Sequence, residues 1–136
     1  MTPDWITVGV ALAIHDAQIA EHGGAPGVRD LALLESALAR PQNLAAYGKG
    51  EPDIARLAAV YACGIAQNHL FVDGNKRTSN VVALTFLELN GYALTADDAE
   101  QVAVWLRVAD GSMKEAELAG WLRKNARALQ RGSRSK

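Results

Sequence analysis

The chain has 136 residues, of which 49% are hydrophobic and 21% are charged. Its length suits a single domain, and its composition excludes a disordered chain. Because 14 lysines and arginines face 15 aspartates and glutamates, the chain lacks the basic surplus of a free nucleic-acid-binding module, and we expect no direct nucleic-acid binding.

Helices are predicted throughout, because alanine and leucine dominate the apolar residues and prolines are few. Apolar residues spaced three or four apart predict a first helix that starts at Ile6 and ends at 23–24, a pair of glycines. Asp30 is a candidate N-cap for a second helix, which is predicted to stop near Arg40 because a proline follows. A proline and two acidic residues at 51–53 suit the start of a third helix. The expected buried stripes are Ile6, Val10, Ala13, Ile14 and Ala17 in the first helix, and Ile54, Leu57, Ala58, Tyr61, Ala62 and Ile65 in the third.

A fourth helix is predicted from about Asn75 to Asn90. Its run at 81–87 is apolar on nearly every side, which is typical of a helix in the middle of a bundle. Gly91 is a natural left-handed cap at its end. The sequence therefore places a buried central helix here.

Two more helices are predicted toward the C-terminus. Thr95 is a candidate cap for a fifth helix that ends at Gly111, and the capping-box pattern at 112–115 opens a sixth. The polar residues 130–136 are predicted to form a disordered tail, which leaves one domain over 1–129. The pattern predicts an all-α fold, a compact bundle of about six helices. The expected stripes are Ala99, Val102, Ala103 and Leu106 in the fifth helix, and Leu118, Trp121, Leu122 and Leu129 in the sixth.

Cysteine content and hydropathy indicate in which cellular compartment the protein is expected. The single cysteine, Cys63, excludes an intramolecular disulfide, and we interpret it as a small core residue in a reducing compartment. The N-terminal segment lacks the basic start of a signal peptide, and no run of about 18 apolar residues exists to span a membrane. We therefore expect a cytoplasmic protein without membrane contact.

The segment at 68–78 carries the residues that indicate chemistry. It connects the third helix to the fourth, and Gly74 lets its backbone bend without steric cost. The first amides of a helix form an anion site, but Lys76 and Arg77 add cations there, against the helix dipole. That placement is explained if a polyanion such as a nucleotide phosphate supplies the compensating charge.

Two further residues of this segment suit phosphate chemistry. Asp73 offers the hard oxygen that Mg²⁺ prefers, and His69 can act as a general base near neutral pH. Taken singly, such a histidine is more often structural, an Asp-Gly pair is usually a turn, and a Lys-Arg pair is usually a solvated surface. Their joint occurrence favours the functional interpretation. Phe71 is interpreted as a core anchor for the loop, and His15 as a structural or groove-lining residue.

Residues 69–77 read His-x-Phe-x-Asp-Gly-Asn-Lys-Arg, which resembles the signature of the Fic/Doc family in the version of its death-on-curing (Doc) branch. Seven specified positions within nine residues make this a specific motif. The resemblance extends from about Trp5 to Leu122. The other similar stretches are 13–16, 23–24, 27–30, 34–38, 40–41 and 86–92.

The resemblance implies a Fic fold, in which the motif loop leads into the central helix. It also implies that His69 takes the proton from a target hydroxyl and that Asp73 holds Mg²⁺ on the phosphates of ATP. The residues that would shape the anion cradle or bind the phosphates are Gly74, Asn75, Lys76 and Arg77.

Two departures from the wider family bear on the reaction. Fic adenylyltransferases usually have glycine where this chain has Lys76, and a second arginine where it has Asn80. A lysine should crowd the cradle, and the missing arginine removes a bidentate phosphate clamp. In the Doc branch this variation accompanies transfer of the γ-phosphoryl group.

The resemblance therefore implies the toxin of a type II toxin–antitoxin system, a protein kinase that modifies a Thr or Ser hydroxyl of elongation factor Tu and arrests translation. The chain has no Ser/Thr-x-x-x-Glu brake, so we expect restraint by a Phd-type antitoxin that binds as a helix in a groove. Two alternatives stay open: a Fic-type adenylyltransferase and a catalytically silent helical binding module.

Overall fold

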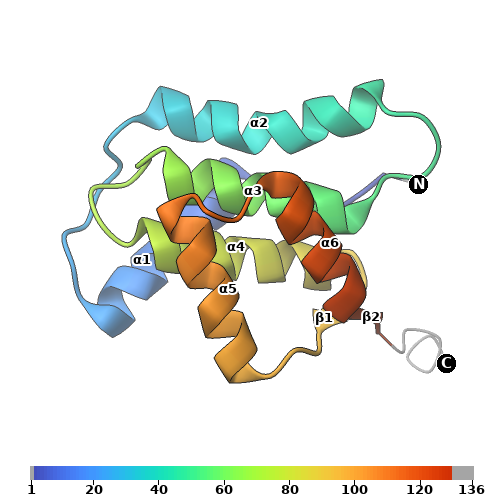
Figure 1. The fold of residues 1–136 in the computed structure, drawn as a ribbon. Helices are drawn as coiled ribbons and strands as arrows, with labels where there is room; N and C mark the ends of the chain where they lie inside the picture. Colours follow the sequence, from blue (N-terminus) through green and yellow to red (C-terminus); the bar gives the residue numbers. More distant parts are fainter. Residues whose placement is uncertain (1, 130–136) are drawn as a thin grey trace, which may run out of the picture.

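Six α-helices and one pair of short strands make up residues 2–129, the part of the chain that the computed structural model describes (Figure 1). The all-α fold is as predicted. The tail predicted at 130–136 lies outside the described residues. The elements are α1 (Val8–His22), α2 (Leu31–Tyr47), α3 (Ile54–Gln67), α4 (Asn75–Leu89), β1 (Tyr92–Leu94), α5 (Asp98–Asp110), α6 (Glu115–Asn125) and β2 (Ala126–Ala128).

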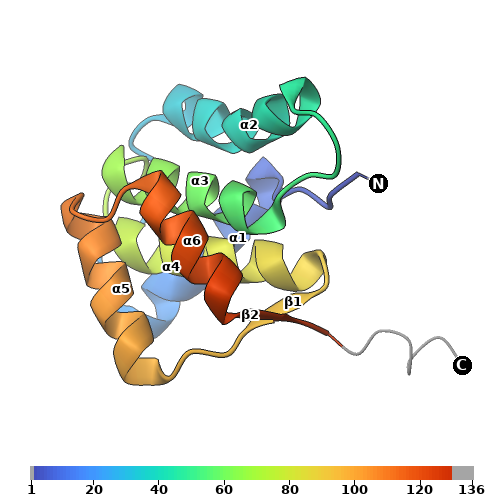
Figure 2. The same ribbon diagram turned by 45° about the vertical axis from the view of Figure 1, so that its right-hand side comes forward.

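The helix α3 runs through the core. It packs against α2, α4, α5 and α6, and both views show α2 and α4 on opposite sides of it (Figure 1, Figure 2). Ten of its 14 residues are buried, and the predicted stripe is among them except for the half-buried Ile54. Many of these residues are alanines, which let the neighbouring helices approach closely. Burial raises the pKa of the Cys63 thiol to about 11, which fits the small core residue expected there.

The predicted central helix, α4, packs against α1 and α3, and six of its 15 residues are buried. Phe86 is fully buried on it, with its ring 5.0 Å from that of Tyr61 and 5.9 Å from that of Trp5. Gly91 ends the helix with a φ of +93°, and its amide donates to Glu88 O at 3.1 Å, which confirms the predicted cap. The motif loop thus leads into a helix that the core holds firmly.

The prediction that the second helix stops near Arg40 is wrong, because α2 continues through Pro41 to Tyr47. A proline inside a helix costs on the order of 3 kcal/mol. Burial of Pro41 and packing of Leu44 and Ala45 against the core offset that cost. The preceding Arg40 also pairs with Glu115 of α6, which fastens the middle of α2 to the bundle.

The predicted starts of the fifth and sixth helices are also wrong. Asp97, not Thr95, caps α5, and its side chain accepts from Glu100 N at 2.8 Å. Thr95 instead binds Asn125 O through its amide and its hydroxyl, at 2.7 and 2.8 Å. The expected capping box at Ser112 does not form, since α6 begins three residues later without a side-chain cap.

Two of the predicted buried stripes lie on the wrong face. On α1 the buried residues are Ala11 and His15, and on α5 the buried face includes Trp105. Both helices carry apolar residues on more than one side, so spacing alone did not identify the buried side. The residues predicted to be buried but found exposed are Val10, Ala13 and Ala17 on α1, and Ala99, Val102, Ala103 and Leu106 on α5.

The strands β1 and β2 pair antiparallel, with Ala93 opposite Arg127. Neither strand was predicted, because three residues are too short for an alternating pattern. The pairing also ends α6 at Asn125, so the prediction that placed Leu129 on the sixth helix is wrong. No helix within residues 2–129 is both long and apolar enough to cross a membrane.

Candidate active site

The motif segment forms the loop between α3 and α4. Leu70 and Phe71 are buried and anchor this loop in the core, as predicted for Phe71, whereas His69 and Asp73 are exposed. Gly74, with a φ of +76°, turns the chain into α4. The buried residues therefore anchor the loop, and the candidate catalytic and metal-binding residues lie on its exposed side.

Asn75 closes the loop upon itself. Its Oδ1 accepts from Phe71 N, and its Nδ2 donates to Phe71 O, both at 3.0 Å. The side chain thus supplies hydrogen-bond partners for the backbone amide and carbonyl of Phe71. Asn75 contributes to the site by fixing the shape of the loop.

His15 of α1 packs against the buried side of the loop. Its ring lies 3.9 Å from that of Phe71 at an interplanar angle of 7°, and it is 1% exposed. Its Nε2 lies 2.8 Å from Asp73 O. Since a carbonyl can only accept, this contact requires the proton on Nε2. His15 is therefore structural, one of the two roles expected for it, although its spacing from Phe71 in the sequence gave no sign of the contact.

The Asp73 carboxylate joins the loop to the segment after α1. Its Oδ2 accepts from Ala25 N at 3.2 Å, and its Oδ1 accepts from Gly74 N at 3.0 Å. Gly24 passes so close that a Cβ there would lie 2.9 Å from Oδ2, and its φ is +114°. The close approach and the positive φ therefore favour glycine at position 24, a reason that the sequence did not reveal.

The N-terminus of α4 is open and carries two cations. The first helical hydrogen bond is donated by Thr78 N to Gly74 O, so the three preceding amides lie outside the helical pattern, and no side chain caps the helix. Lys76 and Arg77 are exposed in this turn. Arg77 Nη2 donates to Gly23 O, the C-cap carbonyl of α1, at 3.3 Å. The negative end of α1 therefore offsets part of the unfavourable placement of Arg77.

A cavity of about 310 Å³ adjoins this turn, between α4 and α5. Asn80 Oδ1 and Trp105 Nε1 are buried without a hydrogen-bond partner among the described residues, and both residues line the cavity. An unpaired acceptor on α4 and an unpaired donor on α5 thus lie in the two helices that flank the cavity. The sequence did not indicate a pocket here. Its lining residues are Lys76, Arg77, Asn80, Asp98, Gln101, Val102, Trp105 and Leu106.

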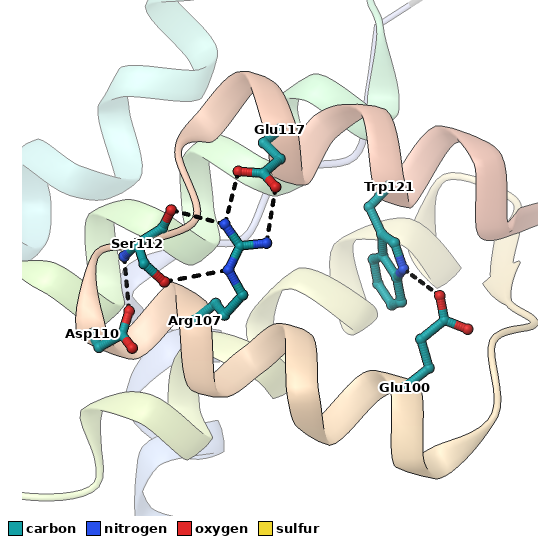
Figure 3. Close-up of polar contacts among 6 residues, drawn as sticks. All are labelled: Glu100, Arg107, Asp110, Ser112, Glu117 and Trp121. Carbon is teal, nitrogen blue, oxygen red and sulfur yellow. Dashed lines mark hydrogen bonds and ion pairs between the residues drawn. The ribbon is translucent and has the colours of Figure 1, made fainter.

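The α5 wall of the cavity is fastened to α6 (Figure 3). Arg107 binds both carboxylate oxygens of Glu117, at 2.8 and 3.1 Å, and also binds Ser112. Nearer the other end, Trp121 Nε1 donates to Glu100 Oε2 at 2.8 Å. The hydrogen bond from Arg107 lowers the pKa of the Glu117 carboxyl. We refer to Arg107, Ser112 and Glu117 as the α5–α6 clamp.

This arrangement is that of an all-α protein whose histidine-containing loop feeds an open, cationic helix N-terminus. A sequence model described as the Fic/DOC family matches residues 5–87, which end within α4. The chain belongs to this family.

Two relatives cover most of the chain. The protein named "Protein kinase doc" of Escherichia phage P1 is 34% identical over 113 residues, which are 83% of this chain and 88% of the relative. The protein named "Toxin Doc" of Mycolicibacterium smegmatis is 41% identical over 105 residues, which are 73% of this chain and 81% of the relative.

Proposed function

We propose that this protein is the toxin of a type II toxin–antitoxin system and acts as an ATP- and Mg²⁺-dependent protein kinase. It transfers a phosphoryl group to a Thr or Ser hydroxyl of a translation factor, and the motif resemblance favours elongation factor Tu. Family membership and the names of the two relatives support the class of activity. The single observation that carries the chemistry is the histidine loop that runs into the open, cationic N-terminus of α4.

The ATP phosphates would bind at the start of α4. The free amides of the first turn and the positive end of the helix dipole attract anions. Lys76 and Arg77 would add charge-assisted contacts. A Cβ at Gly74 would lie 3.1 Å from Ile19 Cδ1, so glycine keeps this turn tight as well as left-handed.

Asp73 is suited to hold Mg²⁺ against these phosphates. Each carboxylate oxygen accepts one backbone hydrogen bond, and a carboxylate oxygen retains acceptor capacity beyond one such bond. Mg²⁺ is commonly held by one or two carboxylates together with substrate phosphates. When bound, the ion would neutralise charge on the transferring group.

His69 would be the general base. Its exposure leaves the imidazole accessible to a protein substrate. As the target hydroxyl oxygen bonds to the γ-phosphorus, the hydroxyl proton passes to the imidazole, and the bond from that phosphorus to the β,γ-bridging oxygen breaks. ADP leaves with the electron pair of that bond, so the atoms and charges balance.

The nucleoside would occupy the cavity between α4 and α5. Val102 and Leu106 would supply an apolar wall for the purine, and Gln101 and Asp98 line the same cavity with polar groups. Asn80 offers no positive charge for a phosphate where the adenylyltransferases have an arginine. These features favour the kinase over adenylyl transfer, and a built cavity favours an enzyme over a silent binding module.

An antitoxin of the Phd type is the proposed partner. We place its helix in a groove of the bundle, where it would cover apolar side chains that the isolated protein exposes. Val102 and Leu106 of α5, which also line the proposed nucleotide cavity, are 59% and 52% exposed, so an antitoxin helix bound to this face would also cover that cavity.

One incubation separates the candidate reactions. The purified protein is mixed with elongation factor Tu, Mg²⁺ and ATP labelled at either the α or the γ phosphate. We expect label on the target from the γ position in the parent, and labelling about 10²- to 10⁴-fold slower with His69→Ala. Label from the α position would establish adenylyl transfer instead, and an unlabelled target would contradict the proposed substrate.

A further inference from the structure

Three consecutive carbonyl groups at the end of α3 all bind Arg29. Its Nη2 donates to Asn68 O at 3.2 Å, its Nε donates to His69 O at 2.6 Å, and its backbone amide donates to Leu70 O at 2.8 Å. Arg29 lies between α1 and α2, about 40 residues away in sequence. One residue from a distant segment therefore holds the whole turn in which the chain leaves α3.

His69 has an unusual backbone in this turn. Its φ is +50°, and no other residue besides glycine has a positive φ within the described ranges. A left-handed conformation is strained for a histidine and persists only where the surroundings enforce it. The 2.6 Å hydrogen bond to the His69 carbonyl comes from a cation, which also suits the negative end of α3.

The backbone on both sides of Arg29 is attached to the same loop. Val28 forms an antiparallel bridge with Phe71, and Val72 N donates to Gly27 O at 3.1 Å. On the other side, Asp30 caps α2 through a 3.0 Å hydrogen bond from Leu33 N. The guanidinium is therefore presented from a fixed backbone, although its side chain is exposed.

We propose that Arg29 is a positioning residue, which holds the His69 backbone in its left-handed turn and so sets the direction in which the imidazole leaves the loop. Arg29 acts through His69 and does not contact the reacting atoms. The inference rests on the proposed role of His69 as general base. A displaced base loses its alignment with the target hydroxyl while the phosphate site at the start of α4 stays intact.

The kinetic test compares Arg29→Ala and Arg29→Lys with a control, Arg56→Ala. The control alters an exposed arginine in the first turn of α3. We expect Arg29→Ala to lower kcat by about 10- to 100-fold while KM for ATP changes less than about twofold. Arg29→Lys should recover part of the rate, because one ammonium can bind one of the carbonyls. Guanidinium added at non-denaturing concentrations should restore activity to Arg29→Ala and leave the parent unaffected.

A spectroscopic readout tests the turn independently of catalysis. A positive φ brings the amide and α protons of one residue close together, so the parent should give a strong NOE between these protons of His69. We expect that NOE to weaken in Arg29→Ala and to persist in Arg56→Ala. If Arg29→Ala does not fold, Arg29→Lys provides the same comparison.

The outcomes separate the inference from the proposed function. Parent-like kcat in Arg29→Ala, or lost activity with an unchanged His69 NOE, would overturn the positioning role. A larger effect on KM for ATP than on kcat would overturn it too. If His69→Ala is as active as the parent, the proposed role of His69 fails, while the NOE comparison still decides whether Arg29 holds the turn.

Discussion

The ring of His15 lies parallel to the ring of Phe71 at 3.9 Å, and the same imidazole binds Asp73 O at 2.8 Å. A residue of α1 thus supports both the buried anchor of the motif loop and the backbone of its exposed aspartate. The candidate site therefore depends on a contact between residues that are 58 positions apart in the sequence.

Replacement of His15 should therefore destabilise the fold and the site together. We expect His15→Ala to lower the free energy of unfolding by about 2–4 kcal/mol, because it removes buried ring packing and a hydrogen bond. His15→Phe, which keeps the stacked ring, should cost less, about 1–2 kcal/mol for the unpaired Asp73 carbonyl. Urea unfolding followed by circular dichroism measures both. Equal stability of the parent and His15→Ala would contradict the support role.

Gly24→Ala tests the close approach to Asp73. The added Cβ would lie 2.9 Å from Asp73 Oδ2, in a backbone conformation that alanine rarely adopts. We expect a loss of about 1–3 kcal/mol in thermal or urea unfolding. The matched control is Gly120→Ala in α6, where a Cβ meets nothing within 4 Å, and it should stabilise by about 0.5–1 kcal/mol. Equal effects of the two substitutions would refute the steric argument.

Lys76→Ala and Arg77→Ala test the anion site at the start of α4. Each should weaken ATP binding by about 1.5–3 kcal/mol, because each removes a charge-assisted contact to phosphate. Calorimetric titration with ATP and Mg²⁺ measures the change. The stability of Lys76→Ala should stay the same or rise slightly, since a cation leaves the positive end of a helix. Unchanged affinity in both variants would remove the proposed phosphate site.

The α5–α6 clamp should weaken in acid. The hydrogen bond with Arg107 lowers the pKa of Glu117 in the folded protein, so its contribution is present above the ordinary glutamate pKa and is lost as pH falls through the lowered one. Below about pH 4.3, the usual glutamate value, the parent should therefore lose stability more steeply than Glu117→Gln. Because the pair is exposed, the difference should be small and should shrink in high salt. Parallel curves of unfolding free energy against pH would contradict this.

The sequence predicted those parts of the molecule that depend on local pattern. The stripe of α3 is unbroken and contains small residues, so its burial could be read directly. The Gly91 cap and the anchoring role of Phe71 were likewise visible from one residue and its neighbours. The motif also located the loop between α3 and α4, because reactive residue types gather there.

The remaining features depend on partners that are distant in sequence. Pro41 stays within α2 only because the core covers it, and Asp97 outcompetes Thr95 because Thr95 is bound to Asn125. Arg29 gave no local signal, since its role exists only where its segment meets the end of α3. The roles of the motif residues in catalysis and in metal and nucleotide binding stay predictions.

The most direct test of the central claim is the intact mass of elongation factor Tu after incubation with this protein, ATP and Mg²⁺. The parent should add the mass of one phosphoryl group, and His69→Ala should add it about 10²- to 10⁴-fold more slowly while it binds ATP as tightly. An added mass of AMP, an unmodified target, or a His69→Ala variant as fast as the parent would contradict the account.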